Sequence, residues 1–233
     1  MNGSLVTLIT GGSSGIGASV TRDLLGKGHR LAITGRDAGR LKRFADSLGN
    51  PAELLTLPGD ASNAPDVERA VAAVLDRYGR LDVAIANAGF ATRDTIADGD
   101  PAQWREMVLT NVLGPALLVR YALPALRETQ GRIVLVGSVA GLIGSPGNVY
   151  GATKWAVTGL AENVRRLVTG DGVGVTLIAP GRIDTPFWDD LGGAQGTALL
   201  TADQIAQAIA WTIDQPARVD VNTVVVRPTG QQN

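Results

Sequence analysis

Residues 5–17 read LVTLITGGSSGIG, in which a short apolar run is followed by a turn containing four glycines. The run at residues 5–10 has the length and composition of a strand buried on both faces. A helical pattern at residues 18–25 follows the turn. Together they predict a phosphate cradle, because glycines let the backbone approach a ligand closely and a helix N-terminus presents free N–H groups. The expected cradle residues are Gly11, Ser13, Ser14, Gly15, Ile16 and Gly17.

The glycines are spaced T-G-x-x-x-G-x-G, which differs from the general dinucleotide pattern G-x-G-x-x-G. A flexible glycine turn that binds no ligand is the alternative interpretation. The strand before the turn and the helix after it favour the phosphate cradle.

A second apolar run, at residues 30–34, ends in Gly35-Arg36-Asp37. In a dinucleotide site the end of this strand lies beside the adenosine ribose, where an acidic side chain would bind a free 2′-hydroxyl. Arg36 suits a 2′-phosphate instead, so the sequence favours NADP over NAD. The alternative is that Arg36 merely pairs with Asp37 on the surface.

The same unit of strand and helix recurs along the chain. Further strands are expected at residues 54–57, 81–86, 131–138, 173–179 and 221–226, with a helix at residues 67–78. This alternation predicts an α/β fold, a doubly wound parallel sheet of about seven strands with helices on both faces. Ligands bind beyond the carboxyl ends of such strands. The residues expected at that edge are Thr10, Gly35, Asp60, Asn87, Ser138 and Pro180.

The composition fits one α/β domain spanning residues 1–233, since 45% of the residues are hydrophobic. The 21 basic and 22 acidic residues give a net charge of -1, so we expect neither a nucleic acid nor an anionic membrane as partner. The absence of cysteine excludes disulfides, thiolate catalysis and Cys-ligated metals, and no metal site is expected.

The single histidine, His29, is expected on the surface in a turn before a strand. No charged and then apolar leader opens the chain, and no apolar run approaches the length of a membrane span. A soluble cytoplasmic protein is therefore expected.

Tyr150 and Lys154 stand at i and i+4 in the stretch VYGATKW, residues 149–155. In a helix, the phenol and the ammonium would share one face. A positive charge held near a phenol favours phenolate and lowers the pKa from roughly 10. The pair is thus a candidate acid or base for a small molecule.

These features together resemble the short-chain dehydrogenase/reductase family from end to end. The short chain, the stretch at residues 149–154 and the ending at residues 221–229 resemble the NADP-dependent 3-hydroxy acid (serine-type) dehydrogenase and carbonyl reductase members of that family. The resemblance implies a Rossmann-type fold and NADP(H)-dependent interconversion of a carbonyl and an alcohol. The matching segments are residues 10–17, Asp60, Asn87-Ala88-Gly89, Asn111, Ser138, Tyr150, Lys154 and Pro180-Gly181-Arg182-Ile183-Asp184-Thr185.

The resemblance also implies a role for each matched residue. Tyr150 would donate the proton and Ser138 would hold the carbonyl oxygen. Lys154 would bind the nicotinamide ribose and lower the pKa of Tyr150, while Asn111 would anchor a water that links Lys154 to solvent. The cofactor would contact Asp60, Ala61, Asn87, Ala88, Gly89, Pro180, Gly181, Ile183 and Thr185. One departure is Ala86 before Asn87, where the family commonly has a second asparagine.

The substrate region is expected at residues 187–200, where glycines indicate a flap and aromatic residues an apolar wall, although both could be plain packing. Arg182 and Arg93 are candidates to bind a substrate carboxylate. The resemblance also implies a homodimer or homotetramer, since residues 107–126 and the helix after Tyr150 are apolar on several sides. Pro115 and Pro124 are expected to bend or end the first of these helices.

Two functions of different classes follow from these residues. The favoured one is an NADPH-dependent carbonyl reductase acting on a ketone, an aldehyde or a β-keto acid. The alternative is a catalytically silent NADPH-binding regulatory protein of the same fold. The complete set Asn111, Ser138, Tyr150 and Lys154 argues against that alternative, because a sensor needs only the glycine turn and Arg36.

Overall fold

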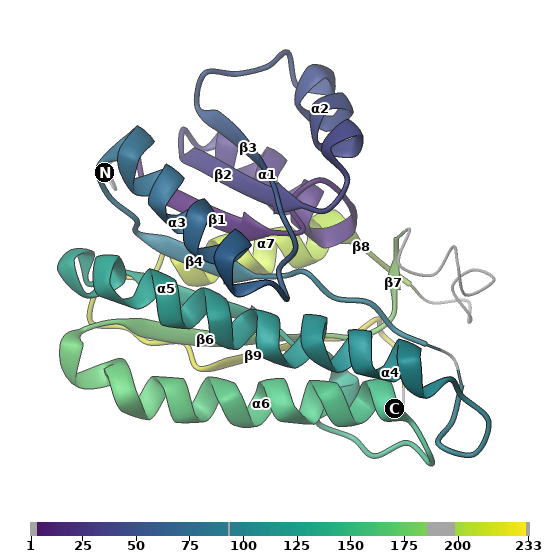
Figure 1. Cartoon of the computed structure of the whole chain (residues 1–233). Helices are drawn as coiled ribbons and strands as arrows, with labels where there is room; N and C mark the ends of the chain where they lie inside the picture. The colour runs from purple at the N-terminus through teal and green to yellow at the C-terminus, as the bar shows by residue number, and fades with distance from the viewer. Residues whose placement is uncertain (1–3, 93, 186–198, 232–233) are drawn as a thin grey trace.

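A seven-stranded parallel sheet forms the centre of the computed structural model, which describes residues 4–92, 94–185 and 199–231 (Figure 1). The order β3-β2-β1-β4-β5-β6-β9 confirms the predicted Rossmann-type fold. Its strands are β1 (Val6–Thr10), β2 (Arg30–Gly35), β3 (Leu54–Pro58), β4 (Val83–Ala86), β5 (Arg132–Val136), β6 (Gly174–Pro180) and β9 (Thr223–Val226). A small second sheet pairs β7 (Ile183–Asp184) with β8 (Leu200–Thr201), which the sequence did not predict.

Seven α-helices lie between the strands of the described chain, and five of them are capped at the N-terminus by a polar side chain. They are α1 (Gly15–Gly26), α2 (Ala38–Ser47), α3 (Ala64–Tyr78), α4 (Pro101–Val108), α5 (Gly114–Thr129), α6 (Val149–Val168) and α7 (Ala202–Ile213). A short 3₁₀ helix, Val139–Gly141, follows β5, and another, Thr169–Asp171, follows α6. A π-helix, Leu109–Leu113, joins α4 to α5. Side chains of Asp37, Asn63, Asp100, Asn148 and Thr201 accept N–H bonds at the starts of α2, α3, α4, α6 and α7.

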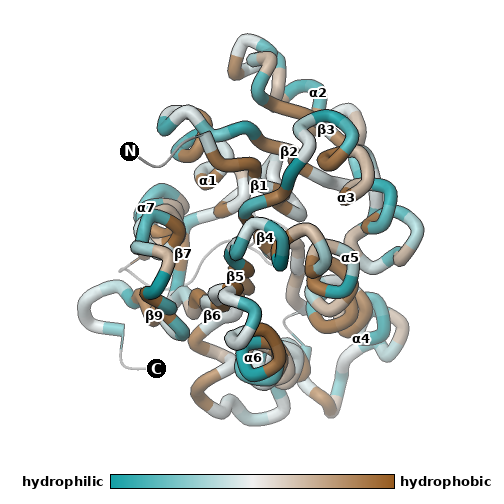
Figure 2. Tube along the Cα trace, turned by 90° about the vertical axis from the view of Figure 1, so that its left-hand side faces the viewer, coloured by the Kyte–Doolittle hydropathy of each residue, from teal (hydrophilic) through white to brown (hydrophobic). Residues whose placement is uncertain are grey.

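Two apolar cores lie on opposite faces of the sheet. Alternate residues of a strand point to opposite faces, so Val83 and Ile85 belong to one core while Ala84 and Ala86 belong to the other. Helices α1 and α7 cover the first face and α3, α5 and α6 cover the second (Figure 2). Because both faces are covered, the central strands are apolar along most of their length.

The chain reverses its winding between β1 and β4. From β1 it moves outward through β2 to β3, and it then returns to place β4 on the other side of β1. The loops after β1 and β4 therefore diverge at the carboxyl edge and leave room for a ligand there.

The expectation that His29 lies on the surface was wrong. His29 is only 5% exposed, because it lies between the end of α1 and the start of β2. Pro115 and Pro124 were expected to bend or end their helix, and neither ends it: Pro115 stands in the first turn of α5, where its missing N–H costs little, and α5 continues past Pro124 to Thr129.

The expectation that no apolar run approaches the length of a membrane span was wrong: the helical stretch Pro101–Thr129 is long and apolar enough to cross one, and it is the one such stretch in the described ranges. It is a core helix of the fold: α5 packs on α3 and on β4, and Leu118, Ala122 and Leu126 are buried there. Packing on the sheet and on α3 therefore explains the buried part of its apolar surface.

Candidate active site

The glycine turn sits at the end of β1, as the sequence predicts. Gly11 and Gly15 have φ values of +68° and +49°, which side-chain-bearing residues rarely adopt. A side chain at Gly17 would collide with the carbonyl oxygen of Gly11. Ser14, the N-cap residue of α1, makes no side-chain capping bond, in contrast to the caps of α2, α3 and α6. The first N–H groups of α1 thus lack the side-chain partner that those helices have.

Polar contacts tie this turn to the end of β4. The side-chain amide of Asn87 donates to the carbonyl oxygens of Thr10 and Gly11 at 3.0 and 3.1 Å. The hydroxyl oxygen of Thr10 accepts N–H bonds from Asn87 and Ala88, both at 3.1 Å. Asn87 therefore holds the glycine turn in place, and Thr10 is a positioning residue that the sequence placed only at a strand end.

Asp60 and Ala61 lie at the carboxyl end of β3. One carboxylate oxygen of Asp60 accepts bonds from the backbone N–H and the hydroxyl of Ser62, at 2.8 and 2.7 Å. The carboxylate of Asp66, in the first turn of α3, accepts the N–H of Asp60 at 2.8 Å and so holds this loop to the helix. A cavity of about 390 Å³ opens beside them, lined also by Thr10 and Thr34.

Arg36 follows β2 and is exposed. Asp37 caps α2 by accepting the N–H of Arg40 at 2.9 Å, and its ion pairs, both at 4.0 Å, are with Arg40 and Arg43. Across the ranges that the structure describes, no ion pair joins Arg36 to Asp37. The surface pairing considered as an alternative for Arg36 is therefore not formed.

Ser138, Tyr150 and Lys154 come together between β5 and α6. Tyr150 stands in the first turn of α6, Ser138 two residues after β5, and the hydroxyls of the two are hydrogen-bonded. Lys154 is buried one turn further along α6 and donates to the carbonyl oxygen of Val136 at 3.0 Å. Its ammonium lies 5.7 Å from the centre of the Tyr150 ring. The predicted shared face of Tyr150 and Lys154 is confirmed.

Burial sets the protonation of this cluster. It raises the pKa of Tyr150 to about 12, and the hydrogen bond with Ser138 acts in the opposite direction. Burial also lowers the pKa of Lys154 to about 8. In the chain itself, the net effect on the phenol is therefore an upward shift of its pKa, and burial is the largest cause of that shift. That Lys154 lowers the pKa of Tyr150, as the resemblance implies, stays a prediction.

Asn111 lies at the centre of the π-helix and is 1% exposed. Its side-chain oxygen accepts the N–H of Phe90 at 3.0 Å, and its amide donates to the carbonyl oxygen of Phe90 and to the hydroxyl of Thr153 at 2.9 and 3.1 Å. Gly89 is packed between Asn111 and Lys154, since an added Cβ would lie 3.0 Å from the Asn111 oxygen and 3.7 Å from the ammonium. Phe90 and Thr153 were missed by the sequence reasoning, although Thr153 precedes Lys154 directly.

The segment after β6 closes the site. An added Cβ on Gly15 would lie 3.7 Å from Thr185, so this segment faces the glycine turn. Ile183 is buried and Arg182 is exposed. Pro228 and the side chain of Gln231 pack on Gly181, and Gln231 accepts the N–H of Arg182 at 3.0 Å. Arg93 and residues 187–198 of the predicted flap lie outside the described residues.

The polar side chains of this edge can position a carbonyl or hydroxyl group and move one proton. Within residues 4–92, 94–185 and 199–231, no three His, Asp or Glu side chains cluster in a way that could hold a metal ion. Ser138, Tyr150 and Lys154 supply two hydroxyls and an ammonium at the same edge of the sheet as the glycine turn.

Comparison with known proteins gives a concordant result. Residues 5–196 match the family described as short chain dehydrogenase. The chain is 32% identical over 240 residues to the NADP-dependent 3-hydroxy acid dehydrogenase of Shigella flexneri, with 97% of this chain and 96% of the relative covered.

Two solved structures extend the similarity to the fold. One is an alcohol dehydrogenase from the archaeon Thermococcus sibiricus complexed with 5-hydroxy-NADP, with a TM-score of 0.89, 29% identity and 99% of both chains covered. The other is the closed form of serine dehydrogenase complexed with NADP+, with a TM-score of 0.89, 32% identity and coverage of 95% and 94%. With its sheet order, its strand-end residues and these matches in agreement, the chain belongs to the short-chain dehydrogenase family.

Proposed function

We propose that this oxidoreductase interconverts a carbonyl compound and an alcohol with NADP(H) as the hydride carrier. The observation that carries the proposal is the hydrogen-bonded pair of hydroxyls, Ser138 and Tyr150, above the buried ammonium of Lys154. A carbonyl that receives hydride gains negative charge on its oxygen, and two preplaced hydroxyls stabilise that charge.

In reduction, Tyr150 gives its phenolic proton to the carbonyl oxygen and Ser138 donates a hydrogen bond to the same atom. When bound, NADPH supplies the hydride, so that carbonyl, NADPH and one proton become alcohol and NADP+. The raised pKa of Tyr150 keeps that proton in place at neutral pH. Lys154 then compensates the phenolate that forms, because its pKa of about 8 leaves it mostly charged at pH 7.

The residues present fit NADP. The first N–H groups of α1 have no side-chain cap, which suits a pyrophosphate. Ser13 lies 3.6 Å from the Cβ position of Gly35, so its hydroxyl and the exposed Arg36 stand at one strand end, where a 2′-phosphate would bind. Asp60 borders the cavity beside β3, which suits an adenine. Along the cofactor we assign Ala88, Gly89, Pro180, Ile183 and Thr185.

For the substrate we infer a carboxylate-bearing compound, a β-keto acid or β-hydroxy acid, bound by Arg182. Arg182 is exposed at the carboxyl edge of the sheet, in the segment that faces the glycine turn. A guanidinium binds a carboxylate through two parallel N–H bonds. The similarity to the 3-hydroxy acid dehydrogenase of Shigella flexneri supports this substrate class.

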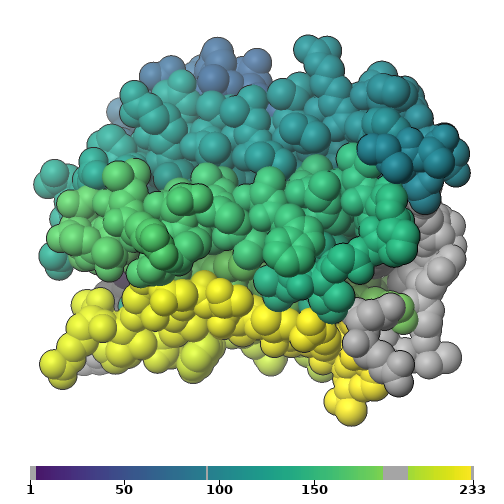
Figure 3. All heavy atoms as spheres, turned by 90° about the horizontal axis from the view of Figure 1, so that it is seen from below, coloured from purple at the N-terminus to yellow at the C-terminus, as the bar shows by residue number. Residues whose placement is uncertain are grey.

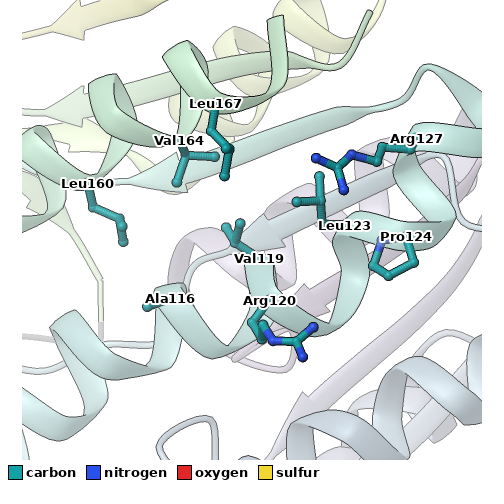
Figure 4. A pocket seen from close by; sticks show the side chains of 9 residues that line it. All are labelled: Ala116, Val119, Arg120, Leu123, Pro124, Arg127, Leu160, Val164 and Leu167. Atoms are coloured by element: carbon teal, nitrogen blue, oxygen red, sulfur yellow. The ribbon is translucent and has the colours of Figure 1, made fainter. Parts of the chain in front are cut away.

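We also infer a homodimer that uses α5 and α6. Helix α6 runs across the middle of one face of the molecule (Figure 3), with Leu167 63% and Trp155 49% exposed. A cavity of about 220 Å³ separates α5 from α6, and mostly apolar side chains line it (Figure 4). Apolar surface of this kind is typical of a contact between subunits. A two-fold axis would place α6 of one subunit against the same helix of the other.

The deciding experiment follows NADPH oxidation with a panel of aldehydes, ketones, β-keto acids and neutral diketones. Turnover should fall by about 10²- to 10⁴-fold in Tyr150→Phe, since that change removes only the general acid. NADPH binding, measured by fluorescence titration, should be unchanged in this variant. Tight NADPH binding without turnover of any panel member by the unmodified protein would contradict the reductase proposal and favour a regulatory protein.

A further inference from the structure

The side-chain amide of Asn111 is fully used inside the protein. An amide has two N–H donors, and here one goes to the carbonyl oxygen of Phe90 and the other to the hydroxyl of Thr153. Its oxygen accepts the N–H of Phe90. Asn111 therefore has no donor left for substrate, cofactor or water. Its side chain locks the π-helix to the loop after β4 and to α6.

The hydroxyl of Thr153 completes a chain of contacts that ends at the proposed acid. It donates to the carbonyl oxygen of Tyr150 at 2.7 Å. A threonine hydroxyl has a single proton, so once that proton is given to Tyr150 the same oxygen can only accept from Asn111. Thr153 is 3% exposed, which excludes solvent as a competing partner. The direction of both bonds is thus fixed by chemistry.

We propose that Thr153 is a positioning residue, which couples the π-helix at Asn111 to the first turn of α6 and thereby sets the place of Tyr150. The proposal rests on the proposed reductase function. The hydrogen bonds of the Thr153 hydroxyl go to Asn111 and to the backbone carbonyl of Tyr150. It acts through the backbone of Tyr150, on the helix that also carries Lys154.

The π-helix is the reason that such a coupling is needed. A single π turn widens a helix locally and is stable only where other contacts hold it, which is why such turns concentrate at functional sites. Here it separates α4 from α5, and the N–H of Gly114 bonds back to Leu109. The buried bond between Asn111 and Thr153 joins this turn to α6 across 42 residues of sequence.

The test compares Thr153→Val with Thr153→Ser. Valine keeps the shape but removes the hydroxyl, which leaves the Asn111 amide and the Tyr150 carbonyl without their partner. We expect kcat to fall about tenfold or more in Thr153→Val, since small displacements of a reacting group have large effects on rate. The KM for NADPH should stay within about twofold, and Thr153→Ser should restore kcat.

Thr212 offers a matched control. It is also fully buried in a helix and also donates at 2.7 Å to the carbonyl three residues before it, but it lies in α7 on the opposite face of the sheet. Thr212→Val also removes a buried hydroxyl, so it should lower the midpoint of thermal unfolding and leave kcat unchanged. If Thr153→Val does not fold, Thr153→Ala is compared with Thr153→Ser in the same way.

The possible outcomes separate the two proposals. An unmodified protein that binds NADPH but turns over no panel member overturns the reductase function and, with it, this inference. An active unmodified protein whose Thr153→Val variant keeps kcat within about twofold overturns only the role of Thr153. A loss of kcat that Thr153→Ser does not restore also overturns it, because the hydroxyl would then not be the group that matters.

Discussion

The ammonium of Lys154 donates a hydrogen bond of 3.0 Å to the carbonyl oxygen of Val136. This bond joins α6 to the last residue of β5, two positions before Ser138. It fixes the charge beneath the phenol of Tyr150 and fixes both relative to the strand that carries Ser138. The alignment of the three side chains is therefore a property of how one helix docks on one strand.

The pKa of Lys154 predicts the pH dependence of the reduction. Its pKa of about 8 means that the ammonium is charged below that pH and loses its proton above it. Tyr150, with a pKa of about 12, stays protonated over the same range. We expect kcat/KM for reduction to be flat between about pH 6 and 7 and to fall by up to tenfold per pH unit above about 8. Lys154→Arg should lose this alkaline decline in whatever activity it retains, because a guanidinium does not titrate there; a decline at the same pH in this variant would contradict the assignment.

Arg36 should set the preference between the two dinucleotides. Replacing it with serine removes a cation from the proposed 2′-phosphate site, and charge-assisted hydrogen bonds contribute about 1.5–3 kcal/mol each. The KM for NADPH should therefore rise about 10- to 100-fold, while the KM for NADH should not rise. Steady-state kinetics with both cofactors measures the ratio, and an equal rise for both would count against a 2′-phosphate contact.

Arg182→Ala should discriminate between substrate classes. The change removes the guanidinium and keeps the two backbone bonds of this position, to Gln231 and to Leu200. We expect the KM for a β-keto acid to rise about tenfold or more, since a carboxylate would lose a charged partner. A neutral ketone of similar size is the control, and its KM should stay within about twofold. Equal effects on both substrates would rule out a carboxylate contact.

Leu167→Asp should weaken the proposed dimer. In a two-fold interface each subunit contributes its own Leu167, and burial of a leucine contributes about 2 kcal/mol. The dissociation constant should thus rise by about 100-fold or more, which sedimentation equilibrium can measure. Ile96→Ser changes another exposed apolar residue, in the loop before α4, and should leave the dissociation constant unchanged. A monomeric unmodified protein at micromolar concentration would contradict the dimer.

His29 should make the fold sensitive to mild acid. Burial lowers the pKa of His29 below its usual 6.5, against opposing effects of Asp214 and Asp23, with Lys27 acting in the same direction as burial. As the pH falls through 6.5 the unfolded chain takes up the proton more readily, so this contribution to stability is present above pH 6.5 and is lost below it. The free energy of unfolding should fall by up to about 1.4 kcal/mol per pH unit from this group as the pH drops below 6.5. His29→Gln should show a smaller fall over that interval in urea titrations; an identical slope would contradict it.

The sequence by itself determined the strands, their order of appearance and the set of residues at their carboxyl ends. Apolar runs of four to seven residues, punctuated by glycine and polar residues, are local signals, and each of the seven sheet strands begins or ends within two residues of its predicted bounds. The i, i+4 spacing of Tyr150 and Lys154 is equally local. The glycine turn could also be predicted from the sequence, because the carbonyl oxygen of Gly11, only six residues earlier, leaves no space for a side chain at Gly17.

The tertiary structure alone decided which polar groups pair and how burial changes them. Asn87 holds the glycine turn by hydrogen bonds to Thr10 and Gly11, which lie 77 and 76 positions earlier in the sequence. Asn111 bonds to Thr153, which lies 42 positions later. The burial of His29 and the raised pKa of Tyr150 likewise depend on elements packed around them. Hydrogen bonds and desolvation depend on distances in space, and a local pattern in the sequence does not contain those distances.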